Sequence, residues 1–419
     1  MPPHNATARE GQRICLPSIL NAVAHSQLLH QVYEALAEEH ESLVLDFSSC
    51  VKAYQDGVVP TICTTDFLRE FGIAISVILP STWQLASLFH DHGWAHLLSP
   101  TEFPLTAGRK TGLSATRFQD PSAQKQIVDS MVDLVMGQME LSRDALAGLE
   151  WTFNELTDNV LNHAEAPDGG IAQGTIFPKS REIHLIVADA GQGILNSLKE
   201  GFPELGTDEQ AIGEAVKEGV TRNADAGQGN GLAGSLRIAA ASGGRFQVLS
   251  GRAYFQVFVD SDTKDVQSRM APRSISARFH GTAVYVRLNL DHPFVLAEAL
   301  DFGGGPYQPS DWIETKYANT DHDLVLLVGD ETIGFGSRAA GLALRTKCKN
   351  LLAAEPGSRL ALDWTGIPIV SSSFADEAIG RLFRELGPLE FSRRVAHRGM
   401  EPTVRQLVDR AIIQRMRQD

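Results

Sequence analysis

A helical segment with a continuous polar line on one side is the feature that most limits how this chain folds. Residues 155–166 read ELTDNVLNHAEA, in which Glu155, Asn159 and His163 are four residues apart. Side chains at that spacing lie above one another on one face of a helix. The neighbouring stripe is apolar and consists of Leu156, Val160 and Ala164. The apolar side is therefore expected to pack against a sheet, and the polar side either faces a ligand or is simply solvated.

Two glycine clusters follow the polar helix along the chain. The first, DAGQGI at 189–194, comes directly after the apolar run IHLIVA, so Asp189 lies where a strand ends and a turn begins. The second, GQGNGL at 227–232, precedes a helical pattern, and amides at a helix start can receive phosphate oxygens. Taken alone, the first indicates a tight turn, and the second lacks the gap of a dinucleotide-binding fingerprint. The sequence has no GxxxxGK followed by Ser or Thr, which excludes a P-loop.

These three segments, in this order and closed by GTAVYVRL at 281–288, resemble the boxes of the GHKL ATPase superfamily. That superfamily includes gyrase, the Hsp90 chaperones, MutL, histidine kinases and anti-sigma-factor kinases. The polar helix is similar to the N box in its anti-sigma form, Glu-x-x-x-Asn-x-x-x-His, and the glycine clusters are similar to the G1 and G2 boxes. The resemblance covers residues from about 123 to 291. It implies a Bergerat α/β sandwich, with helices on one face of a mixed sheet, that binds ATP and Mg²⁺.

The resemblance also implies a role for each matching position. Glu155 would be the general base, which polarises a water or a partner hydroxyl for attack on the γ-phosphate. Asn159 would hold Mg²⁺, and Asp189 would accept the exocyclic amine of adenine. His163 either contacts phosphate or is a satisfied packing histidine. The other positions expected around the nucleotide are Gly191, Gly193, Ile194, Gly227, Gly229, Gly231, Leu232 and Thr282.

The N-terminal residues 1–105 alternate strand and helix signals. Short apolar runs predict strands at 43–49 and 73–80, and the segment between them, 57–72, fits a helix closed by a glycine. A strand–helix–strand order of this kind predicts a small sheet with crossover helices.

The C-terminal residues 292–419 repeat the same alternation, which suggests two copies of one domain type. LALDWTGIPIVSSSFADEAIGRLF, within about 322–415, resembles a STAS-like domain. The resemblance implies that a serine at the strand-to-helix turn is phosphorylated by a kinase. Ser372 or Ser373 lies at that turn. A hydroxyl at a helix start is more commonly only an N-cap. The expected fold class is α+β, with a Bergerat domain at 106–291 between a degenerate STAS-like domain at 1–105 and a second one at 292–419.

Three functions fit this organisation. The first is a Mg-ATP-dependent regulatory switch whose STAS-like domains engage a protein partner. The alternatives are an anti-sigma-type protein serine kinase that modifies a STAS serine, and a nucleotide-gated scaffold with negligible turnover. Glu155 favours catalysis over the scaffold. A long helical pattern at 123–148 contains no histidine, which counts against a standard histidine kinase.

The net charge and the cysteines indicate which kinds of partner and which cellular compartment are expected. A net charge of −14 argues against a mainly electrostatic nucleic-acid or membrane binder. The four cysteines have no CxxC spacing, so they are expected to be reduced thiols in a cytoplasmic protein. The sequence also lacks a run of the ~18 apolar residues that a spanning helix needs. A homodimer is common in the resembling superfamily, but no residue here establishes one.

Overall fold

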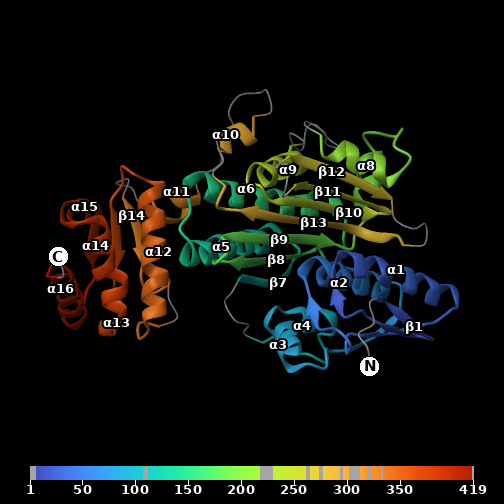
Figure 1. Ribbon diagram of the computed structural model, residues 1–419, viewed down its shortest axis with the longest axis horizontal. Coiled ribbons are helices and arrows are strands. Elements are labelled where there is room, and N and C mark those ends of the chain that lie inside the picture. The colour runs from blue at the N-terminus through green and yellow to red at the C-terminus, as the bar shows by residue number, and fades with distance from the viewer. Residues whose placement is uncertain are drawn as a thin grey trace. The chain divides into compact units, whose positions relative to one another are not determined.

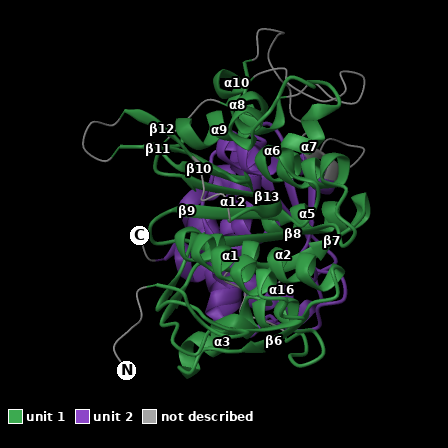
Figure 2. Ribbon diagram, turned by 90° about the vertical axis from the view of Figure 1, so that its right-hand side faces the viewer, with its two compact units in different colours: residues 1–131, 151–307 green, residues 132–150, 308–419 purple. Residues whose placement is uncertain are grey.

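The computed structural model describes most of the chain as two compact units (Figure 2). Unit 1 comprises Met1–Met131 and Trp151–Tyr307, and unit 2 comprises Val132–Glu150 and Gln308–Asp419. The predicted division at 105 and 291 concerns domains, which these units do not test, so it stays a prediction. The described residues are 6–106, 112–217, 230–260, 265–272, 277–292, 296–301, 312–318, 323–331 and 334–417.

The N-terminal region of unit 1 is a small α/β layer. Its sheet has the order β1-β2-β4-β6, with β1 antiparallel to β2 and the other pairs parallel. The strands are β1 (Ala8–Glu10), β2 (Arg13–Cys15), β4 (Ser42–Asp46) and β6 (Ala74–Ile78), with β3 (Ile19–Leu20) paired to β5 (Lys52–Ala53). The helices are α1 (Ala22–Ala37), α2 (Gln55–Glu70), α3 (Trp83–Asp91) and α4 (Trp94–Leu98). The predicted strands at 43–49 and 73–80 and the helix between them are confirmed.

The central sheet of unit 1 has seven strands in the order β12-β11-β10-β13-β9-β8-β7 (Figure 1). Every neighbouring pair is antiparallel, so the predicted mixed sheet is wrong. The reason lies in the connection between β9 and β10: these strands point the same way, but β13 is inserted between them and runs against both. The strands are β7 (Gly112–Phe118), β8 (Gly170–Phe177), β9 (Glu182–Asp189), β10 (Arg245–Gly251), β11 (Ala253–Val259), β12 (Val266–Pro272) and β13 (Phe279–Asn289).

Both faces of this sheet are covered. Along β9, Leu185 and Val187 alternate with Ile186 and Ala188, and all four side chains are buried. One face packs against helices of the same region, and α2 from the N-terminal region packs on the other, against β8, β9 and β13 (Figure 1). The helices of the central region are α5 (Pro121–Gln138), α6 (Arg143–Asn159), α7 (Gly193–Lys199), α8 (Asp208–Ala215), α9 (Gly231–Ala241) and α10 (Leu296–Ala299).

The helical pattern predicted as one helix at 123–148 is interrupted. Helix α5 ends at Gln138 and α6 begins at Arg143. The Ser142 hydroxyl accepts a hydrogen bond from the Ala145 N–H at 3.1 Å, as a cap of the new helix. The first part of α6, with residues 143–150, belongs to unit 2, and residues 151–159 belong to unit 1.

Unit 2 contains a three-stranded parallel sheet of order β14-β15-β16. Its strands are β14 (Leu324–Leu327), β15 (Leu360–Asp363) and β16 (Val395–Arg398). Its helices include α11 (Trp312–Tyr317), α12 (Arg338–Ala354), α13 (Ser372–Ala375), the π-helical turn η2 (Asp376–Gly380), α14 (Arg381–Leu386), α15 (Pro388–Arg394) and α16 (Pro402–Met416). The predicted strand–helix alternation of this region is confirmed. Among the helices described in either unit, none has both the length and the apolar character to cross a membrane.

Candidate functional site

The polar helix carries its predicted side chains at its C-terminal end. Helix α6 is α-helical up to Asn159, and the turn η1 (Val160–Ala164) that continues it is π-helical. Glu155 and Asn159 therefore share a face as predicted. A π turn holds more residues than an α turn, so His163 does not continue the α-helical spacing of Glu155 and Asn159. The backbone carbonyl of His163 accepts a hydrogen bond from Gln192 Nε2 at 2.9 Å.

The first residue of α9 lies against this polar face. A Cβ atom added to Gly231 would be 2.5 Å from Glu155 Oε2 and 3.5 Å from Asn159 Nδ2. A side chain at position 231 would therefore require the Glu155 carboxylate to move, so glycine leaves this carboxylate its present position. The neighbouring Leu232 is half-buried at the same helix start. The predicted Gly227 and Gly229 lie outside the described residues.

Glu155 has the protonation behaviour of a base that works near neutral pH. Burial raises the pKa of its carboxyl to about 7, and the negative charge of Asp158 adds to the rise. A carboxylate with a pKa near the working pH takes up and releases a proton efficiently. Of the residues at this face, Glu155 is thus the one suited to polarise a hydroxyl or a water.

Asp189 is buried at the end of β9, with 4% of its surface exposed. Its Oδ1 atom accepts hydrogen bonds from the backbone N–H groups of Gly191, at 2.9 Å, and Thr282, at 3.2 Å. Burial raises the pKa of the carboxyl to about 6, although the two hydrogen bonds act against the rise. Within the described part of the chain, no hydrogen bond reaches Oδ2, so this oxygen is available to a ligand donor.

The loop after Asp189 is packed too closely for side chains at its glycines. A Cβ at Gly191 would be 2.0 Å from the carbonyl oxygen of Ala164, and the same oxygen accepts the Gln192 N–H at 2.8 Å. Gly193 has φ +77°, a left-handed conformation that favours glycine. The π turn that ends the polar helix therefore contacts the Asp189 loop and brings the two halves of the site together.

Ser250, which the sequence reasoning missed, joins three segments of the site. Its hydroxyl accepts a hydrogen bond from the Ile194 N–H at 2.9 Å, donates one to the Gly281 carbonyl at 3.0 Å and lies 3.2 Å from Thr282 Oγ1. The ladder between β10 and β13 shifts register directly after Ser250. In the sequence, the only signal is a serine before a glycine at the end of an apolar strand.

The predicted magnesium ligand suits a cation that is held mainly by phosphate oxygens. In the described residues, no group of three or more His, Cys, Asp or Glu side chains is arranged to hold a metal ion. The side chain of Asn159 makes no hydrogen bond to any described residue, and its Nδ2 atom is buried without a partner among those residues. A free carboxamide can turn its oxygen towards a hard cation, so Asn159 fits the role of a single protein ligand.

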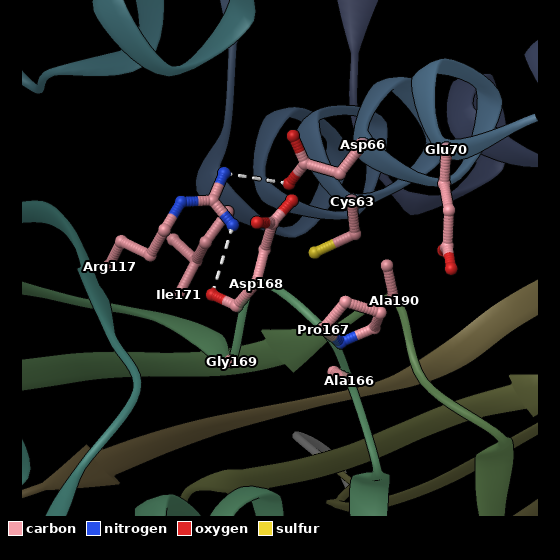
Figure 3. A pocket seen from close by; sticks show the side chains of 10 residues that line it. All are labelled: Cys63, Asp66, Glu70, Arg117, Ala166, Pro167, Asp168, Gly169, Ile171 and Ala190. Atoms are coloured by element: carbon pink, nitrogen blue, oxygen red, sulfur yellow. Dashed lines mark hydrogen bonds and ion pairs between the residues drawn. The ribbon is translucent and has the colours of Figure 1, made fainter. Parts of the chain in front are cut away.

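A hollow lies behind the Asp189 loop, between α2 and the start of β8 (Figure 3). Its cavity volume is about 10 Å³, roughly the space of one water molecule, and Ala190 forms one wall. Across it, Arg117 Nη2 pairs with Asp66 Oδ2 of α2 at 2.8 Å, and Arg117 Nη1 donates to the Asp168 carbonyl (Figure 3). The N-terminal region thus reaches the back of the loop that holds Asp189.

The candidate phosphoacceptor serines are at the start of α13. Ser371 is the N-cap: its hydroxyl accepts the Phe374 N–H at 3.0 Å and lies 2.9 Å from Ser373 Oγ. Ser372 is exposed, so of the two predicted serines it is the more open to a kinase.

Comparison with known proteins identifies one part of the chain. Residues 340–405 match a family described as a STAS-like domain of unknown function (DUF4325). No curated protein and no solved structure matches the chain. The resemblance of 1–105 to STAS-like domains and that of 106–291 to GHKL ATPases therefore remain predictions. The chain contains a STAS-like domain at residues 340–405.

Proposed function

We propose that unit 1 binds Mg-ATP and hydrolyses it, and that the chain is a nucleotide-dependent switch whose STAS-like domain engages a protein partner. The observation that carries the proposal is the state of Asp189. It is a buried carboxylate with one oxygen fixed by two backbone N–H groups and the other without a hydrogen bond in the described residues. Such a group accepts an exocyclic amine, which adenine has at the position where guanine has an oxygen.

Hydrolysis is assigned to Glu155. With a pKa of about 7, its carboxylate can take a proton from the attacking water as the γ-phosphate is transferred. The start of α9, at Gly231, lies against Glu155 and supplies backbone N–H groups suited to phosphate oxygens. Mg²⁺, held by Asn159 and the phosphates, would neutralise charge on the triphosphate.

Nucleotide binding is tested by calorimetry with Mg-ATP and Mg-GTP. We expect wild type to bind ATP and to discriminate against GTP. Asp189→Ala should remove the preference for adenine, and Asn159→Ala should abolish binding of Mg-ATP without unfolding the chain. Asn162→Ala, at an exposed position of η1, is the matched control and should bind as wild type. Unchanged ATP affinity in both site variants would contradict the assignment.

The hydrolysis step is tested by its pH dependence. A general base acts only when deprotonated, so phosphate release should rise with pH, reach half of its maximum at about pH 7 and level off above that pH. Glu155→Gln should lose this profile and fall by at least about 100-fold. Equal, near-zero rates for wild type and variant would leave only the scaffold function.

A protein serine kinase is the second candidate, because Ser372 is exposed at the start of α13. Transfer of label from γ-³²P-ATP to the protein, lost in Ser372→Ala and retained in Ser371→Ala, would favour the kinase. Release of free phosphate with no labelled protein would favour the switch.

A further inference from the structure

One buried side chain of the STAS-like domain holds the turn between α5 and α6. Asn350 of α12 is 3% exposed. Its Oδ1 atom accepts the Leu141 N–H at 2.8 Å, and its Nδ2 atom donates to the carbonyls of Met136 and Met139, both at 2.8 Å. The end of α5 and the following turn leave these three main-chain groups without helical hydrogen bonds. The carboxamide of Asn350 bonds to all three.

Charged pairs surround this contact along α12. The buried Lys347 lies one turn before Asn350, and its ammonium is 2.9 Å from Asp133 Oδ1. Lys347 also pairs with Glu331, which satisfies a second side of the charge. Lys349 pairs with Glu140 at 2.5 Å at the solvent-exposed rim. The contact is therefore polar, directional and specific to one position of the turn.

The turn is continuous with the helix that carries the candidate site. Arg143, the first residue of α6, is 3.4 Å from Glu355 beyond the end of α12. Glu155 lies about 18 Å further along the same helix, at ~1.5 Å per residue. An α-helix keeps its length and its side-chain phase through its hydrogen bonds, so a shift or rotation at Arg143 also moves Glu155 and Asn159.

We propose that the STAS-like domain regulates the nucleotide site from within the chain: α12, through Asn350, fixes the α5–α6 turn and so sets the position of Glu155 and Asn159. Asn350 is a positioning residue, since it acts through α6 and does not touch the nucleotide. The effect on the rate of ATP hydrolysis rests on the proposed function. The contact between Asn350 and the α5–α6 turn can be measured without nucleotide. A partner that binds the STAS-like domain then acts on hydrolysis by tightening or loosening this contact.

The test compares Asn350→Ala with Thr346→Val in the full-length chain. Thr346 is buried on the same helix, but its hydroxyl bonds to the Leu342 carbonyl of α12 itself, so it is the matched control. Two quantities are measured: phosphate release at saturating ATP and amide hydrogen exchange over residues 136–164. We expect Asn350→Ala to lower the rate about tenfold, the effect of about one hydrogen bond, and to speed exchange at Leu141 and across 151–159. Thr346→Val should change neither.

The design separates failure of this inference from failure of the nucleotide site. If wild type neither binds nor hydrolyses ATP, the proposed function fails, and faster exchange across 151–159 in Asn350→Ala still supports the hold on α6. Unchanged exchange and unchanged rate in a folded Asn350→Ala would overturn the inference. If that variant does not fold, Glu140→Lys breaks the same contact at its exposed rim and should lower the rate about twofold. Glu38→Lys, which breaks an exposed pair with Arg9 in the N-terminal region, should leave the rate unchanged, and equal rates for both lysine variants would also overturn it.

Discussion

Two helices, α2 of the N-terminal region and α12 of the STAS-like domain, follow similar strand signals in the sequence but make opposite kinds of contact. Helix α2 is buried on most sides and joins the apolar core that also contains Ile171, Ile186 and Ala283 of the central sheet. Helix α12 holds the α5–α6 turn through the polar groups of Lys347, Lys349 and Asn350.

The difference has an energetic meaning. Burial of apolar surface is non-directional and adds up over the whole contact, so α2 is part of the fold of unit 1. The hydrogen bonds and ion pairs of α12 are directional, so they fix one position of the α5–α6 turn, and breaking them would leave the buried Lys347 and Asn350 without partners. The first kind of contact builds the site, and the second is suited to adjust it.

The largest effect is expected when the same charged side chain is placed in each contact. Cys63 of α2 is 1% exposed and lines the hollow behind Ala190. Cys63→Asp buries an unpaired carboxylate and should lower the free energy of unfolding of unit 1 by at least about 4 kcal/mol. Lys349→Asp, at the exposed rim of the α12 contact, should cost only about 1 kcal/mol, because the new carboxylate and Glu140 both stay in contact with water. Urea unfolding resolved by hydrogen exchange measures both, and an equal cost would remove the distinction between the contacts.

A middle effect is expected at the ion pair between α2 and β7. Arg117→Ala leaves Asp66 buried without this partner and should destabilise unit 1 by about 2 kcal/mol at pH 7. Burial already raises the pKa of Asp66, so its charged form is the disfavoured one, and the cost appears as pH rises through that pKa. The loss should therefore shrink as pH falls through the raised pKa of Asp66. Lys125→Ala breaks an exposed pair with Asp129 and should cost under about 0.5 kcal/mol at any pH.

The smallest loss of stability is expected when one hydrogen bond of the N-terminal region or one ion pair of α12 is removed. Tyr33 of α1 donates its hydroxyl to the Arg278 carbonyl at 2.9 Å, just before β13. Tyr33→Phe should destabilise unit 1 by about 1 kcal/mol, and Lys349→Ala should destabilise unit 2 by about 0.5 kcal/mol or less. Thermal unfolding followed by circular dichroism gives both values. A larger loss from Lys349→Ala would reverse the ranking of the two regions.

Local patterns sufficed to predict the strands, most helices and the grouping of Glu155 with Asn159, because apolar periodicity and glycine turns depend on near neighbours. The features that were missed depend on distant residues. The break after Gln138 is stabilised by Asn350, about two hundred positions later. The antiparallel sheet depends on β13 entering between β9 and β10. The position of Ser250 between three segments depends on the register shift between β10 and β13, which the local sequence does not predict.

The covering of the second sheet face by α2 was also not predicted. The run IHLIVA is apolar at every position, which indicates a strand buried on both faces. That signal does not say which segment covers each face. The structure shows that α2 is the cover: the ring of Phe67 is stacked on His280 with centroids 3.7 Å apart, and Asp66 pairs with Arg117.

The wide turn at Val160–Ala164 limits how this part of the chain can change in length. Loss of one residue there would rewind the turn as ordinary α-helix and swing the Ala164 carbonyl away from the Gln192 N–H. The loop that presents Asp189 would then lose its anchor, even with every side chain of the site intact. Homologous chains that keep this corner should therefore differ from one another by replacements between 155 and 194 and conserve the number of residues across the turn.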